Sequence, residues 1–207
     1  MHIFKGAVEV WDYSYANIDL LRSFGLNAHL MMVGYHDSIK KSIDSKQDET
    51  IIENSNKTNV VFVGVVNQFR YNRIHKIKYF LLESTRFEYR KSSGRFVSQD
   101  KIALNLHYYE GKTILETHRI SEYLASKLVV LSEKSQDFEL DNLFSPMVIY
   151  FKDRADLERK FIELSSLSDQ ELEAKGIAAY EKFKAMPRFG EYFDKSTSIL
   201  KSFDHRE

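Results

Sequence analysis

Two groups of polar side chains follow two apolar segments in the middle of the chain. Residues 101–108 and 128–131 have the pattern of buried strands, and a helical pattern over 113–126 connects them. A strand–helix–strand unit of this length is a right-handed crossover between parallel strands. The polar groups His107–Glu110 and Ser132–Asp137 therefore lie side by side at the carboxyl edge of the predicted sheet. Ligands bind at that edge in sheets of this kind, so we expect a site for a polar ligand there.

A glycine and two arginines follow another predicted strand. Residues 59–65, NVVFVGV, form the clearest buried strand in the sequence, and a basic helix over 67–83 follows. Gly64 permits close approach of a ligand to the backbone, and Arg70 and Arg73 can donate paired hydrogen bonds to an anion near the start of the helix. The pattern fits a diphosphate site and an ordinary turn with solvated arginines about equally. It lacks the glycine spacing of dinucleotide-binding and P-loop proteins.

Three charged residues lie at helical spacing on the central helix. Glu116, Arg119 and Glu122 are neighbours there, and such a set is more often a ladder of surface ion pairs than a catalytic group. Glu110 differs because it lies in the loop at the strand end, where a ligand is expected. His107 lies on a predicted strand, and a lone histidine there is more often hydrogen-bonded in the core than a catalytic base.

The sequence does not indicate metal chemistry. The seven histidines show no H-E-x-x-H spacing, and no D-x-D pair follows a strand. Asp12 and Asp137 are single carboxylates, and Ser135 has no nucleophile elbow around it. The chain has no cysteine, which excludes disulfides, thiolate metal sites and cysteine nucleophiles. We therefore expect no cofactor and no metal bridge to a bound diphosphate.

The elements that must position these residues alternate along the chain. This alternation predicts an α/β fold over residues 1–207, a Rossmann-like, doubly wound and mainly parallel sheet in one domain. Near its start, Ser14 is placed to cap a helix over 15–24. Residues 133–145 read as a polar loop. Residues 153–203 read as helices that form a C-terminal flank.

The C-terminal helices have clear start signals. Asp153 is placed to cap a helix over 154–165. Ser168 and Glu171 have the spacing of a capping box before the next helix. Residues 189–203 have the pattern of a last amphipathic helix.

Composition narrows the class of protein. The 207 residues are 43% hydrophobic and 29% charged, which is enough for a packed core. Thirty basic and thirty acidic residues give a formal net charge of zero, so nothing points to nucleic-acid binding. No apolar run approaches the ~20 residues of a membrane span, and the first residues lack a signal-peptide pattern. We expect a cytoplasmic protein.

Three blocks of the sequence resemble small glycosyltransferases. Residues 9–35, EVWDYSYANIDLLRSFGLNAHLMMVGY, are similar to a "VWDYS–NI–L" run followed by a strand that ends in "GY". Residues 61–73 resemble the family's strand and "G–N–R" phosphate loop. Residues 105–137, which contain NLHYYE, LETHRISEYL and VVLSEKSQD, are similar to its "LNIHYYE–ILE–RI–LL–VVSE–D" core. The blocks occur in the family's order over most of residues 9–137.

The resemblance implies the nucleotide-sugar half of a GT-B glycosyltransferase, an enzyme of polysaccharide biosynthesis with two Rossmann-like domains. By that resemblance, Glu110 and Glu116 lie near the donor sugar and ribose, and Ser132 and Glu133 line the donor pocket. The implied ligands of the diphosphate loop are Gly64, Asn67, Arg70, Arg73 and Arg119. The family's usual acceptor-binding domain has no counterpart before residue 9, so the resemblance implies that a second domain, another chain or a homodimer completes the site.

Two hypotheses about function follow. In the first, the chain is a hexosyl- or deoxyhexosyl-transferase that moves a sugar from a nucleotide-diphosphate donor to a glycan or glycoconjugate acceptor. An inverting reaction would need a base, and the candidates are His107, Glu110 and Asp12. In the second, the chain is a non-catalytic α/β module that binds a nucleotide or a protein and needs a partner domain.

Overall fold

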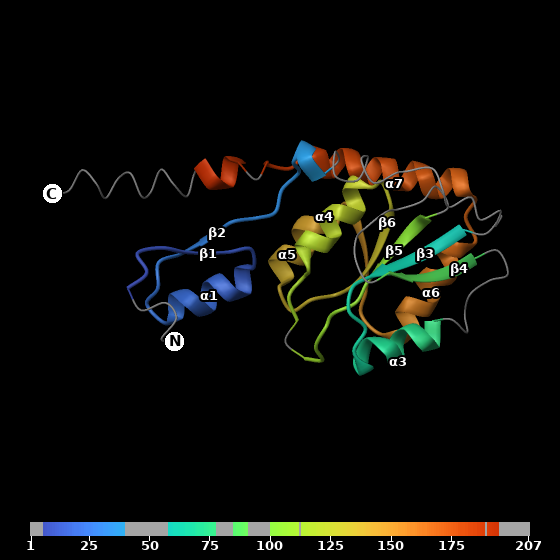
Figure 1. The fold of residues 1–207 in the computed structure, drawn as a ribbon, viewed down its shortest axis with the longest axis horizontal. Helices are drawn as coiled ribbons and strands as arrows, with labels where there is room; N and C mark the ends of the chain where they lie inside the picture. Colours follow the sequence, from blue (N-terminus) through green and yellow to red (C-terminus); the bar gives the residue numbers. More distant parts are fainter. Residues whose placement is uncertain are drawn as a thin grey trace.

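Five parallel strands form the main sheet of the protein (Figure 1). The computed structural model describes residues 6–39, 58–77, 85–90, 100–111, 113–188 and 190–194. The strands are β3 (Thr58–Val63), β4 (Thr85–Arg90), β5 (Asp100–Asn105), β6 (Val129–Glu133) and β7 (Val148–Phe151). Their order is β4-β3-β5-β6-β7, and every neighbouring pair is parallel. The predicted α/β fold with a parallel sheet is confirmed.

Each central strand contains a continuous apolar run because both faces of the sheet are covered. Side chains of β5 and β6 such as Ile102, Leu104 and Val130 are fully buried. A strand covered on both faces reads as a continuous apolar run rather than as an alternating one. This is why the short runs 59–65 and 128–131 were sufficient to predict strands.

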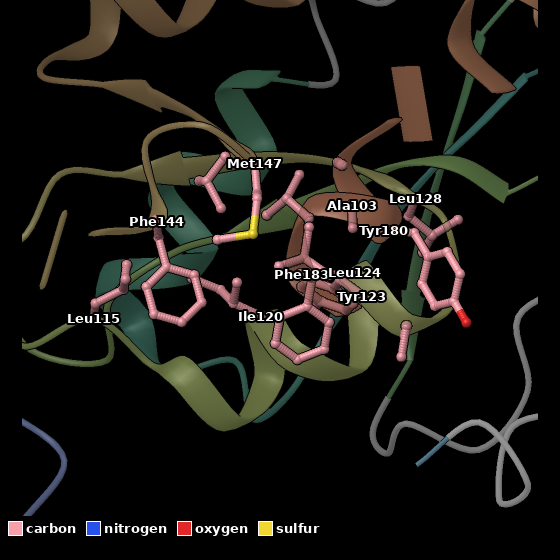
Figure 2. Close-up of a cluster of buried hydrophobic side chains, with 14 of the residues drawn as sticks. Ala103, Leu115, Ile120, Tyr123, Leu124, Leu128, Phe144, Met147, Tyr180 and Phe183 are labelled. Atoms are coloured by element: carbon pink, nitrogen blue, oxygen red, sulfur yellow. The ribbon is translucent and has the colours of Figure 1, made fainter. Parts of the chain in front are cut away.

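Helices cover the two faces and make the sheet doubly wound. On one face, α4 (Thr117–Ala125), α5 (Phe138–Phe144) and α7 (Asp169–Lys184) pack over the sheet through a cluster that includes Tyr123, Phe144 and Phe183 (Figure 2). On the other face, α3 (Gln68–Ile77) and α6 (Arg154–Ser165) contribute Ile74, Leu157 and Phe161 to a second cluster. The C-terminal helices α6 and α7 thus pack on opposite faces.

The predicted helix caps are present. Asp153 accepts a hydrogen bond from the backbone N–H of Asp156 (2.9 Å) at the start of α6. Ser168 and Glu171 form the expected capping box at the start of α7. Residues 190–194 are helical, and residues 195–203 of the predicted last helix lie outside the described residues.

Two boundaries on the carboxyl side of the sheet differ from the prediction. The predicted loop over 133–145 was wrong because α5 lies within it, capped by Asp137 and held by buried Leu140 and Phe144. Helix α4 begins at Thr117 rather than at residue 113. Glu116 consequently precedes the helix.

A separate two-stranded sheet precedes the main one. It consists of β1 (Val10–Asp12) and β2 (Ala28–Leu30), which are parallel and joined by α1 (Tyr15–Ser23). Ser14 caps α1 as predicted, and Gly25 ends it with a φ of +78°, a conformation that favours glycine. We call residues 8–30 the N-terminal unit. The assignment of residues 1–207 to one domain stays a prediction.

No helix in the described ranges combines the length and the apolar content needed to cross a membrane.

The contact between α7 and the end of α4 gives a test of the fold. A Cβ atom on Gly176 would lie 1.8 Å from the backbone carbonyl oxygen of Lys127, and Lys127 itself has a φ of 59°. We expect Gly176→Ala to lower the free energy of unfolding by about 2–3 kcal/mol, because α7 must move away from a rigid backbone group. Urea unfolding monitored by circular dichroism measures this change. The control Lys175→Ala, on the exposed side of α7, should change the free energy of unfolding by less than about 0.5 kcal/mol. Equal stability of the two variants would contradict the observed packing of α7.

Candidate functional site at the sheet's switch point

The topology of the sheet has a switch point between β3 and β5. The chain leaves β3 through α3 on one face, and it leaves β5 through α4 on the other. The segments that follow these two strands therefore diverge at the carboxyl edge. In open α/β sheets, ligands bind at this position. Gly64 follows β3 there, and Leu106 and His107 follow β5.

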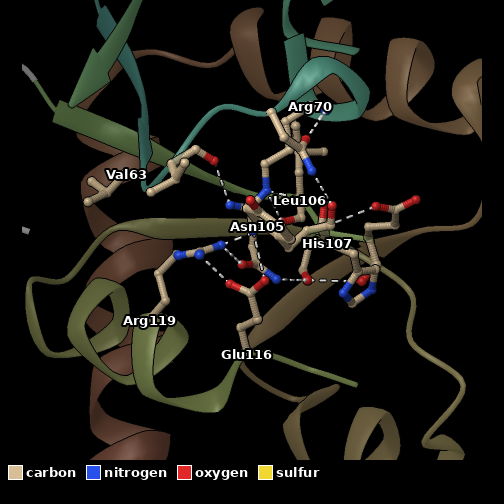
Figure 3. Close-up of polar contacts among 12 residues, drawn as sticks. Val63, Arg70, Asn105, Leu106, His107, Glu116 and Arg119 are labelled. Atoms are coloured by element: carbon tan, nitrogen blue, oxygen red, sulfur yellow. Dashed lines mark hydrogen bonds and ion pairs between the residues drawn. The ribbon is translucent and has the colours of Figure 1, made fainter. Parts of the chain in front are cut away.

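Arg70 is the buried centre of the switch point. Its side chain is only 1% exposed, and it donates hydrogen bonds to the carbonyl oxygens of Leu106 (2.7 Å), His107 (3.2 Å) and Val65 (2.8 Å). Nη2, which donates to Leu106, also donates to Glu116 Oε1 at 2.8 Å (Figure 3). The guanidinium thus holds together the ends of β3 and β5 and the start of α4.

The start of α3 places Arg70 in this position. Asn67 caps the helix by accepting from the Arg70 N–H (2.9 Å), and its amide nitrogen donates to the Tyr108 carbonyl oxygen (2.6 Å). The guanidinium also lies over the rings of Phe62 and Tyr108, 5.3 and 5.1 Å from their centroids. Burial lowers the pKa of Arg70, while the charge of Glu116 acts in the opposite direction.

Glu116 joins Arg70 to a second arginine. Its other carboxylate oxygen pairs with Arg119, whose guanidinium also donates to Asn105 Oδ1 (3.0 Å). These side chains are more accessible than Arg70, with Arg119 18% and Glu116 24% exposed. Two guanidinium groups against one carboxylate leave a formal charge of +1. Because Glu116 is engaged by the arginines, its side chain makes no capping bond to the first N–H groups of α4.

Gly64 brings the backbone close to both arginines. Its φ is +141°, and a Cβ atom there would lie 3.2 Å from Arg119 Nη2 and 3.5 Å from Arg70 Nη1. A side chain at this position would be strained in its backbone and crowded by the guanidinium groups. Glycine thus leaves the backbone of the β3–α3 turn open beside Arg119.

Four predicted residues form a second group beside the first. His107 is buried, and its Nε2 donates to the Lys134 carbonyl oxygen (3.0 Å). Glu133 accepts from the His107 backbone N–H (3.2 Å) and pairs with Arg73, which lies over the Phe69 ring. Buried Ser132 accepts a hydrogen bond from Asn105 (2.9 Å), which links this group to Arg119.

Glu110 lies apart from the arginine cluster, at a pocket between α3 and α6. The pocket has a volume of about 270 Å³. Its lining consists of Phe69, Asn72, Arg73, Glu110, Phe151, Asp153, Arg154, Leu157, Glu158 and Phe161. The Glu110 carboxylate makes no hydrogen bond or ion pair with any residue that the structure describes.

Asp12 belongs to the N-terminal unit, and its carboxylate is engaged locally. Oδ1 accepts from the Ser14 N–H (2.9 Å), and both oxygens accept from the Asn17 side chain (3.2 and 3.1 Å). The catalytic roles of Asp12, His107 and Glu110 stay predictions. Among the described residues no three histidine, aspartate or glutamate side chains gather as a metal site, and independence from metal also stays a prediction.

Two residues of the site were not predicted. Asn105 is buried on β5 between Arg119 and Ser132, and its signal was an amide that interrupts an apolar strand. Asp137 was noted only as a single carboxylate, but it caps α5 and also binds the N-terminal unit. Its position three residues before buried Leu140 is an N-cap signal that could have identified α5.

Comparison with solved structures identifies the fold. The structure is similar to sucrose-phosphate synthase from Thermosynechococcus elongatus, with a TM-score of 0.64 and 10% identity over 100% of this chain and 61% of that chain. It is also similar to trehalose-6-phosphate synthase from a study of glycosyl transfer with retention, with a TM-score of 0.52 and 11% identity over 86% of this chain and 52% of that chain. Both are GT-B glycosyltransferases. The chain has the fold of part of a GT-B glycosyltransferase.

The likeness concerns the fold, and it is partial. The chain spans 61% and 52% of the lengths of these two proteins. No protein-family model matches the chain, and no curated protein matches it in sequence. The expected GT-B-like, Rossmann-like fold is confirmed, while the roles of individual site residues stay predictions.

The contacts of Arg70 predict a structural effect that other arginines should not have. Lysine cannot reproduce the planar fork of donors, so Arg70→Lys would leave several buried carbonyl oxygens without a partner. We expect it to lower the free energy of unfolding by about 3 kcal/mol, measured by urea unfolding. The control Arg73→Lys replaces a partly exposed guanidinium group and should lower the free energy of unfolding by less than about 1 kcal/mol. A small effect of Arg70→Lys, equal to that of the control, would contradict the buried network.

Proposed function

We propose that the chain is a glycosyltransferase, or the donor-binding part of one, that transfers a sugar from a nucleotide-diphosphate donor to a glycan acceptor. The observation that carries this proposal is the net positive arginine–glutamate cluster beside Gly64 at the switch point of a GT-B-type sheet. Such a site suits a diphosphate because it combines fixed positive charge with backbone donors.

The groups of the cluster divide into a support and a contact surface. Arg70 is buried and fully engaged, so its part is to support the site. Arg119 is the arginine of the cluster that reaches the surface beside Gly64. The N–H groups of His118 and Arg119 in the first turn of α4, which Glu116 does not cap, add donors and the positive end of the helix dipole. The diphosphate would bind between Arg119, the start of α4 and the backbone after β3.

This arrangement suits the chemistry of sugar transfer. When the bond between the donor sugar and the diphosphate breaks, negative charge develops on the departing phosphate oxygen. Preorganised donors aimed at that oxygen lower the barrier without a metal ion. Glu116 can accept hydrogen bonds from hydroxyl groups of the donor. If the reaction inverts, Glu110 is the base candidate whose carboxylate has no partner among the described residues.

The rest of the active site is part of the proposal. A glycosyltransferase must also bind an acceptor, and the chain spans only part of the two similar structures. We propose that a second domain, another chain or a second copy of this chain completes the acceptor side.

A thermal-shift titration tests the donor site. The probes are UDP, GDP and ADP and their glucose esters, each with Mg²⁺ and with EDTA. A probe at ~100 times its dissociation constant should stabilise the protein by about 2.7 kcal/mol, which is a shift of several degrees for a domain of this size. We expect one nucleotide to shift the melting temperature equally in Mg²⁺ and EDTA.

A variant pair locates the response. Arg119→Ala should remove most of the shift, because it removes the accessible cation, while Arg159→Ala on the exposed face of α6 should leave it unchanged. No shift with any probe, or an unchanged shift in Arg119→Ala, would contradict the proposed site and favour a module that binds a partner protein.

A further inference from the structure

One buried carboxylate connects the N-terminal unit to the main sheet. Asp137 follows β6 and is 2% exposed. Its Oδ1 accepts from the Leu140 N–H (3.0 Å) at the start of α5, and its Oδ2 accepts from Ser14 Oγ (2.7 Å) and the Ala16 N–H (3.1 Å) at the start of α1. Two helix N-termini therefore share one carboxylate, which their dipoles favour. In Figure 1 the N-terminal unit lies beside α5.

Hydrogen bonds within the turn itself also stabilise the segment that Asp137 binds. Asp12 accepts from the Ser14 N–H and from the Asn17 side chain, and Ser14 Oγ accepts from the Asn17 N–H (3.2 Å). Tyr13 thus lies between two residues whose side chains are both hydrogen-bonded. We call residues 12–17 the β1–α1 turn. Because Asp137 lies just after the carboxyl end of β6, this turn lies on the same edge of the sheet as the candidate site.

Tyr13 lies in this turn, and its hydroxyl group is not used by the described part of the chain. Its side chain is 37% exposed, and it makes no hydrogen bond with any described residue. Burial, followed by the charges of Asp12 and Glu116, raises its pKa above the usual value. The phenol therefore stays neutral at physiological pH and keeps its proton as a donor. The hydrogen bonds of Asp137 to Ser14 and Ala16 hold Tyr13 at the edge of the sheet where the arginine–glutamate cluster lies.

We infer that the β1–α1 turn closes the donor site, that Tyr13 contacts the sugar of a bound nucleotide sugar, and that Asp137 is the positioning residue that holds the turn in place. This inference rests on the proposed function, because it assumes that the diphosphate lies at Arg119 and the start of α4. The sugar lies beyond the diphosphate. A half-exposed phenol offers it a hydroxyl donor for a sugar oxygen and an apolar ring face for its C–H groups.

Calorimetry with paired ligands tests the role of Tyr13. The probes are the nucleoside diphosphate that binds best in the thermal-shift series and its glucose ester. We expect Tyr13→Phe to weaken binding of the glucose ester about fivefold, which is the effect of one lost hydrogen bond. The dissociation constant of the nucleoside diphosphate should change by less than about twofold. Tyr13→Ala should weaken the glucose ester further. The control Tyr71→Phe, on α3, should change neither.

The role of Asp137 needs a readout that a loss of stability alone would not move. Asp141 is the matched control, because it is also buried after β6 but binds Ser135 rather than the N-terminal unit. We expect Asp137→Ala to speed amide hydrogen exchange in α1 and to weaken the glucose ester about as much as Tyr13→Ala does. Asp141→Ala should change neither the exchange in α1 nor the binding of the glucose ester. Asp137→Asn should change both less than Asp137→Ala does.

The outcomes separate this inference from the proposed function. Both hypotheses, the proposed function and this inference, are supported if Arg119→Ala loses binding of both ligands and the Tyr13 and Asp137 variants lose binding of the glucose ester alone. If Arg119→Ala loses both ligands but Tyr13→Phe and Tyr13→Ala bind the glucose ester normally, the inference is overturned and the proposed function stands. Equal weakening of both ligands in the Tyr13 variants also overturns it. If the unaltered chain binds none of the probes, the proposed function fails and this inference fails with it.

Discussion

The buried guanidinium of Arg70 is the interaction on which the rest of the site depends. A buried charge destabilises a protein by several kcal/mol unless it is paired and hydrogen-bonded. Here the guanidinium meets this condition with three backbone carbonyl groups and the carboxylate of Glu116. The carbonyl groups belong to the segments after β3 and β5, so the same bonds that satisfy the charge fix the separation of these two segments. The switch point is therefore a rigid frame rather than two independent loops.

The accessible part of the site is built outward from that frame. Glu116 is oriented by Arg70 and in turn pairs with Arg119, which Asn105 holds from the strand side. Gly64 leaves space for Arg119 to lie against the backbone. A bound diphosphate would find its donors already in place, which is the condition for effective electrostatic stabilisation. Asp137 serves the N-terminal unit in a similar way, because a buried charge with several donors holds two segments that are distant in sequence.

Patterns that depend on near neighbours in sequence predicted most of the fold. The apolar run NVVFVGV and the caps at Ser14, Asp153 and Ser168 were sufficient to place β3, α1, α6 and α7. Helix α5 was missed because it is short, its apolar residues Phe138 and Leu143 are exposed, and Leu140 and Phe144 form its one buried apolar pair.

The roles of charged residues were harder to predict because they depend on distant partners. Arg70 was expected at a ligand, although its spacing from Ile74 places it on the buried side of α3, and that spacing was an available signal. No local pattern shows that Leu106 and His107 supply its acceptors. The contact between Ser14 and Asp137 spans 123 residues, and only the tertiary structure shows it.

Chemical-shift mapping would show whether a nucleoside diphosphate binds at the arginine–glutamate cluster. A ¹⁵N-labelled sample would be titrated with the nucleoside diphosphate that binds best, and the backbone amide signals would be followed. We expect saturable shifts centred on Gly64 and Val65 after β3 and on His118 and Arg119 at the start of α4. Shifts centred instead on Asn72 and Leu157, in the pocket between α3 and α6, would contradict it, as would the absence of any saturable shift.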